Sequence, residues 1–194
     1  TNIQGVTEKA IKAYKKCQEH TPHQTDEIVC GIAGEFVKGI PVSINNIRKK
    51  ADKKITYQEL KQMIEKGRKK ALRKAIKLAE KETGVRNIEM EMIQYSLVEV
   101  KVDGYRVNDP YQFQGNSINI SLFYSFVPLV QLGALRTISS KLGCELKMVI
   151  PEPLSIAYGI MSDESYEFGA IIIDIGGGTT DIAIFKEGSI WYTA

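Results

Sequence analysis

The strongest constraint on the fold is a long amphipathic pattern between Thr56 and Gly84. Thr56 and Glu59 form a capping box, in which the threonine hydroxyl caps the third helical N–H and the glutamate reaches back. Apolar residues then recur at spacings of three and four, at Leu60, Met63, Ile64, Ala71, Leu72, Ala75, Ile76 and Ala79. Gly84 supplies the left-handed residue that ends such a helix. The pattern predicts a helix about 40 Å long that needs a sheet to cover its apolar face.

Strand-like segments surround this helix. Alternating apolar residues predict strands over 40–47, 88–93, 97–102 and 116–127. Pro41 favours an edge position for the first strand, and Asp103-Gly104 predicts a turn. Residues 39–127 are therefore expected to form an α+β module in which one helix covers an antiparallel sheet.

The rest of the chain alternates helix and strand. Helices are predicted from Thr7, the expected N-cap, to Cys17, from Pro128 to Leu142, and over 153–161. Strands are predicted over 27–34, 144–150 and 168–175, followed by a hairpin over 182–192. The fold class is thus an α/β domain, with a sheet parallel at least in part, carrying an α+β insertion. Residues 1–38 and 128–194 belong to the domain, and residues 39–127 form the insertion.

Positive charge is concentrated in one part of the sequence. The chain has 194 residues and a net charge of +3, but residues 48–82 alone hold 14 Lys or Arg against 5 Asp or Glu. This basic helix is either a solvated face, a contact with a partner or neighbouring subunit, or a surface for nucleic acid or anionic membrane. Only Tyr57 interrupts it with an aromatic ring, which argues against single-stranded nucleic acid, and we expect no nucleic-acid partner.

Several classes of protein are excluded. No apolar run approaches the ~18 residues of a membrane span. Cys17, Cys30 and Cys144 are too few and too widely spaced for a disulfide framework, which favours a reducing compartment. His20 and His23 lack further ligands at metal-binding spacing, so we expect an exposed loop there. No Ser/His/Asp or Cys/His catalytic set is evident.

The segment from Ile171 to Asp181 carries the clearest chemistry. An apolar strand delivers Asp174 to its end, and Gly176-Gly177-Gly178-Thr179-Thr180-Asp181 follow. Glycines let backbone N–H groups approach an anion closely, threonine hydroxyls add donors, and a carboxylate can hold Mg²⁺ through water. The pattern indicates a site for the phosphates of a nucleotide. The alternative is a hairpin whose glycines serve only the turn.

This segment resembles the second phosphate motif of the actin and heat-shock-chaperone ATPase superfamily. Pro151–Gly159 resembles the connecting strand-to-helix segment of the same proteins. Within the superfamily the chain is similar to the FtsA family of bacterial cell-division proteins. Three stretches carry that likeness: Gly31–Gly34 with Lys38–Ile40, Asp109-Pro110 with Gly115, and the phosphate motif running on to Trp191-Tyr192-Thr193-Ala194.

The resemblance implies an actin-like, ribonuclease H-like domain that binds ATP and Mg²⁺. Gly176, Gly177, Gly178 and Thr179 would contact the β- and γ-phosphates, with Thr180 and Asp181 beside them. Asp174 would orient Mg²⁺-bound water. Glu152 would either orient water or serve as a structural carboxylate. No residue is assigned a catalytic role.

The chain also departs from the family pattern. The first phosphate loop, the second actin-like half and the C-terminal amphipathic membrane helix of FtsA-like proteins have no counterpart in it. Gln112 stands where the family often has glycine, so we expect a different local turn. The resemblance therefore implies an internal part of a longer protein. We expect this chain alone to bind MgATP poorly and to be inactive, and the longer protein to have at most weak ATPase activity.

The family's role in cell division supplies the expected function. The full-length protein would bind ATP, assemble with itself, and lie in the cytoplasm at the inner face of the membrane. It would bind FtsZ through parts absent here, and the inserted module 39–127 would mediate self-assembly and recruit later division proteins. The alternatives are a PilM-like type IV pilus scaffold and an actin-fold ATPase or sugar kinase with real turnover.

Overall fold

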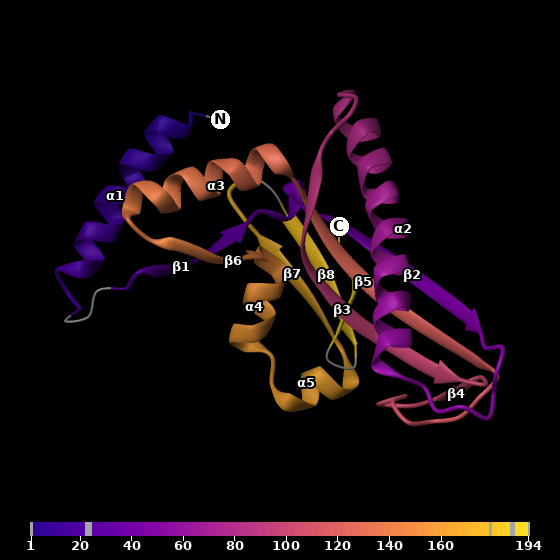
Figure 1. Ribbon diagram of the computed structural model, residues 1–194. Coiled ribbons are helices and arrows are strands. Elements are labelled where there is room, and N and C mark those ends of the chain that lie inside the picture. Colours follow the sequence, from indigo (N-terminus) through magenta and orange to yellow (C-terminus); the bar gives the residue numbers. More distant parts are fainter. Residues whose placement is uncertain (1, 22–24, 179, 187–188, 194) are drawn as a thin grey trace.

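The computed structural model describes residues 2–21, 25–178, 180–186 and 189–193, which form a mixed α/β structure. Its strands lie in three sheets: a parallel pair β1-β6, a four-stranded antiparallel sheet in the order β2-β5-β3-β4, and a three-stranded antiparallel sheet β7-β8-β9. In Figure 1 the four-stranded sheet and α2 lie on one side, α1, α3 and the parallel pair lie on the other, and β7-β8 lies between them.

The elements follow one another in the order that the sequence predicts, with three short additions, one of which is a 3₁₀ turn. The helices are α1 (Ile3–Gln18), the 3₁₀ turn η1 (Gly34–Phe36), α2 (Tyr57–Thr83), α3 (Leu129–Leu142), α4 (Glu152–Ile160) and α5 (Asp163–Phe168). The strands are β1 (Glu27–Ile32), β2 (Lys38–Ile47), β3 (Met90–Val102), β4 (Tyr105–Arg106), β5 (Ser117–Pro128), β6 (Glu145–Pro151), β7 (Ala170–Ile175), β8 (Thr180–Lys186) and β9 (Ser189–Thr193). The sequence analysis missed α5 and β4, which are short.

The α2 helix covers one face of the four-stranded sheet, as its apolar pattern requires. The small residues Ala71 and Ala75 are fully buried and let the helix lie close to the strands. They pack with strand side chains such as Leu122 and Tyr124, and the Tyr124 hydroxyl donates a 2.6 Å hydrogen bond to the carbonyl of Ile64. Burial of this hydroxyl raises the pKa of Tyr124 to about 12.

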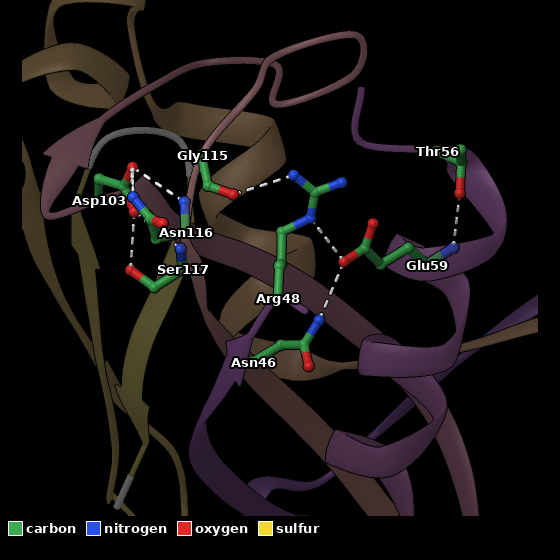
Figure 2. A network of polar contacts seen from close by, with 8 residues as sticks. All are labelled: Asn46, Arg48, Thr56, Glu59, Asp103, Gly115, Asn116 and Ser117. Atoms are coloured by element: carbon green, nitrogen blue, oxygen red, sulfur yellow. Dashed lines mark hydrogen bonds and ion pairs between the residues drawn. The ribbon is translucent and has the colours of Figure 1, made fainter. Parts of the chain in front are cut away.

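The ends of α2 confirm one half of the predicted capping box and correct the other. The Thr56 hydroxyl accepts a 3.2 Å hydrogen bond from the N–H of Glu59, and Gly84 ends the helix in the left-handed region. The Glu59 carboxylate does not reach back to Thr56. It accepts hydrogen bonds of 3.0 Å from the Asn46 amide and the Arg48 guanidinium instead (Figure 2), because these donors lie at the end of the adjacent strand β2.

Two other predictions about element boundaries were wrong. The α1 helix begins at Ile3, since the side chain of Asn2, rather than that of Thr7, caps it by accepting from Gly5 N–H. The two strands expected over 88–93 and 97–102 are one strand, β3. Its register shifts at Met92/Gln94 and at Leu97/Glu99, and these irregularities break the alternation of apolar residues.

The parallel pair confirms the α/β character of the remaining chain. Residues 27–32 of β1 pair in parallel with residues 145–151 of β6. Ile32 and Val149 from these strands pack against Leu132 of α3 and Val127 at the end of β5. None of the described helices is both long enough and apolar enough to cross a membrane.

A second polar network ties the β3–β4 turn to the start of β5 (Figure 2). The Asp103 carboxylate accepts hydrogen bonds from the backbone N–H groups of Asn116 and Ser117, at 3.0 and 2.7 Å. These bonds to the charged form lower the pKa of Asp103. Gly115 is buried beside them, and a Cβ there would meet Val102 and Asp103. Asp103 and Gly104 both have positive φ, which confirms the predicted turn.

Gln112 shows how the loop before β5 accommodates a residue other than glycine. Its φ is +67°, so it adopts the left-handed conformation that glycine favours, and its backbone N–H donates to the carbonyl of Ile55 at 3.1 Å. Gln112 therefore occupies a backbone conformation that glycine would adopt without strain. An L-residue in this region carries strain of about 1 kcal/mol or more.

Replacing Gln112 by glycine should stabilise the protein. The gain, reduced by the greater freedom of glycine in the unfolded chain, is expected to be about 0.5–1 kcal/mol in the free energy of unfolding. Urea denaturation followed by circular dichroism measures it. Gln112→Ala is the control, since it keeps the strain and should show no gain. A glycine variant no more stable than the alanine variant would contradict the strain argument.

Candidate functional site

The predicted phosphate motif forms the connection between two antiparallel strands. In the β7-β8 pair Asp174 lies opposite Asp181 and Ile175 lies opposite Thr180. Gly176, Gly177 and Gly178 follow the first strand, at the end of the hairpin, and are exposed. Thr179 lies outside the described residues. The structure thus brings the two aspartates together at the base of the glycine turn, and both interpretations of the motif include such a hairpin.

The backbone conformation of two of the glycines differs from what the sequence analysis expects. Neither Gly177 nor Gly178 has a positive φ, so left-handed backbone is not the reason for glycine at these positions. A Cβ built at either residue meets nothing within 4 Å. The backbone of both residues therefore faces open space, and the absence of a Cβ leaves it accessible to an anion.

The base of the hairpin packs against the end of β1. A Cβ at Gly34, in the turn that follows β1, would collide with the carboxylate of Asp181, which is buried. A Cβ at Gly31 would lie 3.6 Å from the Cγ of Glu152, the first residue of α4. Gly34 therefore lets the carboxylate of the hairpin approach the end of β1, whereas a Cβ at Gly31 would make only an ordinary contact with Glu152.

The negative charges of both hairpin aspartates act on the carboxyl group of Glu152. Its pKa is raised above the ordinary value, first by burial and then by the negative charges of Asp174 and Asp181. This happens although Glu152 occupies the N-terminal turn of α4, where the helix dipole favours a negative charge. Three carboxylates, from α4, β7 and β8, thus form one electrostatic cluster, which we call the acidic cluster: Glu152, Asp174 and Asp181.

The acidic cluster adjoins a cavity of about 570 Å³. Thr180 and Asp181 line one side of it, and Glu35 and Lys38 line another. The Lys38 ammonium forms a 2.6 Å ion pair with Glu82 of α2. The cavity is therefore bounded by the phosphate motif, by the turn after β1 and by α2.

The donor chemistry fits a hydrated magnesium ion bound with a phosphate. Mg²⁺ keeps several of its waters and takes one or two carboxylates from a protein, and the acidic cluster offers carboxylates beside an open glycine backbone. Among the residues that the structure describes, no three His, Cys, Asp or Glu side chains are grouped closely enough to hold a metal directly.

Sequence reasoning found the hairpin but not all of its surroundings. The family resemblance implies either a water-orienting or a structural role for Glu152, and its electrostatic link to the aspartates emerges only from the packing of α4. In the sequence, Gly34 stands out only as the end of a predicted strand and as part of the Gly31–Gly34 stretch that resembles the FtsA family. The close spacing of Gly31 and Gly34 at the end of a buried strand was the available signal.

Other candidate residues lie away from this site. His20 is exposed, while His23 is outside the described residues. Cys17 is exposed and Cys144 is buried, and all three cysteines are free. Cys30 is half-buried, which raises the pKa of its thiol.

Comparisons with known proteins give both a family and a fold. A family model described as MreB/Mbl protein matches residues 91–194. FtsA of Neisseria meningitidis is 20% identical over 194 residues, all of this chain and 43% of that relative. FtsA of Pseudomonas aeruginosa is 50% identical over 52 residues, 27% of this chain and 12% of the relative. This chain therefore spans less than half the length of these relatives.

A solved structure supports the fold. The PilM–PilN type IV pilus biogenesis complex includes a chain that matches with a TM-score of 0.57 and 10% identity, covering 95% of this chain and 47% of that one. At this identity the likeness concerns the fold alone. Together with the family model it confirms the expected fold class, an α/β structure with an α+β part that makes up a portion of an actin-like fold.

Removing either aspartate should lower the pKa of Glu152. In Asp174→Asn the burial that raises this pKa remains, but one of the two repelling charges is gone. An NMR titration of the side-chain carboxyl measures the shift. Asp109→Asn removes an aspartate of the loop before β5 and serves as the control. An unchanged Glu152 titration in both Asp174→Asn and Asp181→Asn would contradict the acidic cluster.

The same shift links stability to pH. Because the folded-state pKa of Glu152 lies above the unfolded one, its contribution to stability is present at low pH and is lost as pH rises through the folded pKa. Glu152→Gln should therefore be more stable than the parent chain at neutral pH. The two should match near about pH 3.5, below the ordinary glutamate pKa. Urea denaturation at both pH values measures the difference.

Proposed function

The chain belongs to the MreB/Mbl family of actin-like proteins, and from that premise we propose that it is part of an FtsA-like protein of bacterial cell division. In this proposal the protein binds MgATP through the Asp174–Asp181 hairpin, assembles with itself and recruits other division proteins. The observation that carries the proposal is the open glycine backbone beside the acidic cluster. An FtsA relative, that of Neisseria meningitidis, aligns over the whole chain and supports it.

Each residue of the motif has a proposed role. The N–H groups of Gly176–Gly178, with Thr179, bind the β- and γ-phosphates, and Thr180 and Asp181 form the base of the site. Asp174 holds Mg²⁺ through water, as this ion prefers. Glu152 orients a water molecule or keeps the cluster in place. Bound ATP acts as a conformational ligand more than as a fuel, and turnover is weak.

The inserted part of the chain has a separate proposed role. Residues 39–127 form the interaction module for self-assembly and recruitment, with residues 1–38 and 128–194 in the actin-like domain. The longer protein is proposed to lie in the cytoplasm at the membrane, and to bind FtsZ through parts outside this chain. The sheet of residues 38–128 has its own core under α2, which supports treating it as a unit.

A PilM-like pilus scaffold is the second candidate. The structural match to the PilM–PilN complex over 95% of this chain favours it. The triple glycine of the phosphate motif argues for the division role, because PilM-like chains usually have a less glycine-rich motif. Neighbouring genes for division or for pilus assembly would discriminate between the two. An actin-fold ATPase would instead show steady-state release of phosphate, and a kinase would show steady-state formation of ADP when its acceptor is present.

A single added methyl group tests the phosphate site. Calorimetric titration of MgATP is performed on this chain and on a longer protein that contains it. We expect binding by the longer protein and little by this chain. Gly177→Ala adds a Cβ that meets nothing in the free protein, so it should keep the fold yet obstruct the phosphate. We expect it to weaken binding by about tenfold, or 1.4 kcal/mol.

Gly133→Ala is the matched control, because its added Cβ also meets nothing within 4 Å but lies in α3. It should bind MgATP as the parent does. Absence of binding by the longer protein, or equal binding by both glycine variants, would contradict the phosphate site. Tight binding by this chain alone would place the nucleotide elsewhere.

The role of the interaction module is tested by its removal. A longer protein without residues 40–126 should lose self-association in sedimentation velocity, because the proposed contact surface is gone. Its MgATP titration is the control for folding of the remaining domain. Unchanged self-association, with nucleotide binding retained, would count against the module's role and leave the nucleotide proposal intact.

A further inference from the structure

The β2 strand is an edge strand with a basic helix beside it. Of the strands that the structure describes, β5 alone pairs with β2 in the order β2-β5-β3-β4, so alternate backbone groups of β2 have no described strand beside them. Figure 1 shows β2 at the outer margin of the sheet, next to α2. Edge strands of this kind are templates for another strand.

Two observations identify which backbone groups of β2 point outward. Pro41 has no N–H and is exposed, as expected for a position that does not bond to β5. The Ser43 carbonyl accepts a 3.5 Å hydrogen bond from the Lys70 ammonium of α2. Because backbone groups alternate in direction along a strand, Ser43, Asn45 and Ile47 share this outward direction.

The exposed side of α2 supplies charge along this edge. No Asp or Glu occurs between Lys66 and Ala79. In the described part of the chain, none of the exposed cations of this stretch pairs with a carboxylate. We call these exposed cations, together with Lys81 one turn further along the helix, the basic row: Lys66, Lys69, Lys70, Arg73, Lys74, Lys77 and Lys81.

The helix runs antiparallel to β2, which places the basic row along the strand. Glu59 contacts Asn46 near the end of β2, Lys70 contacts Ser43 in the middle, and Glu82 pairs with Lys38 at the start. Residues four apart on a helix share a face and are about 6 Å apart along its axis. Alternate residues of a strand are about 6.6 Å apart, so the two spacings match.

We propose that the β2 edge and the basic row together bind an extended acidic segment of another protein, which adds a strand to the sheet. Main-chain hydrogen bonds to Ser43, Asn45 and Ile47 would hold the segment, and alternate Asp or Glu side chains would pair with Lys66, Lys70 and Lys74. This rests on the proposed recruitment role of the module and specifies the chemistry of the partner.

The geometry favours a peptide over a lipid surface or a nucleic acid. Phosphates can accept hydrogen bonds from lysines and backbone N–H groups, but they cannot donate to the outward carbonyls of residues 43 and 45. A peptide strand both donates and accepts. Pro41 would end the pairing on one side, since it offers no N–H.

The test uses this chain and a fluorescent twelve-residue peptide that alternates Glu with Val or Thr, followed by fluorescence anisotropy with and without MgATP. We expect saturable, salt-sensitive binding that MgATP does not require. The same peptide with alternate backbone nitrogens methylated should not bind. Lys66→Glu/Lys70→Glu/Lys74→Glu should weaken binding by about tenfold or more, since three attractive exposed pairs become repulsive.

Matched variants separate charge and backbone effects. Lys49→Glu/Lys50→Glu/Lys53→Glu makes the same charge change in the loop after β2 and should have a much smaller effect. Asn45→Pro removes one outward N–H and should weaken binding severalfold, whereas Asn45→Ala should not. Circular dichroism and thermal melts check the fold of each variant.

Three outcomes would overturn the inference. The first is absence of peptide binding to the parent chain. The second is equal binding of Asn45→Pro and Asn45→Ala, which would mean that no strand is added. The third is equal or tighter binding of DNA or phosphatidylserine vesicles with the same loss in the triple lysine variant, which would indicate a general anion surface. None of these depends on nucleotide binding, so the proposed function could fail or succeed separately.

Discussion

Burial of β5 is the constraint on which the rest of the structure depends. Tyr124 and Phe126 are fully buried in the core beneath α2, while Phe123, on the opposite face, belongs to the core of the β7-β8-β9 sheet. Val127 joins a third core with the parallel pair. One strand therefore connects all three sheets through side chains that are removed from water. Gly39 of β2 permits this, because a Cβ there would collide with the Phe123 ring.

This arrangement links the interaction module to the candidate nucleotide site. Phe123 packs in the same core as Leu154 of α4 and Phe185 of β8, so the elements that carry the acidic cluster rest on the central strand of the module. The cavity beside the cluster is likewise bounded by α2 and by the phosphate motif. A ligand at the hairpin would contact a surface shared with the module, which gives the proposed conformational role of ATP a physical route.

Local signals in the sequence identified most of the elements because each signal acts over a few residues. The threonine cap, the period of α2 and Gly84 defined that helix without reference to the sheet. These local signals gave wrong predictions where residues distant in the sequence determine a hydrogen-bond partner or the extent of a strand. Glu59 bonds to Asn46 and Arg48 rather than to its own helix end, and β3 is one strand because β5 pairs with it across two irregularities. Gln112 has a left-handed backbone conformation, which a glutamine in the sequence does not predict.

The sequence by itself determined the glycine-rich motif between two acidic residues, the order of the longer helices and strands, and the concentration of positive charge on one helix, since all three depend on neighbouring residues. The tertiary structure alone decided that Glu152 lies near Asp174 and Asp181, because this requires α4 and the hairpin to pack together. It also decided that the basic row of α2 follows the open edge of β2. The reason is physical. A charge pattern defines one face of a helix, but only tertiary packing determines whether that face lies beside a strand, beside a cavity or in solvent.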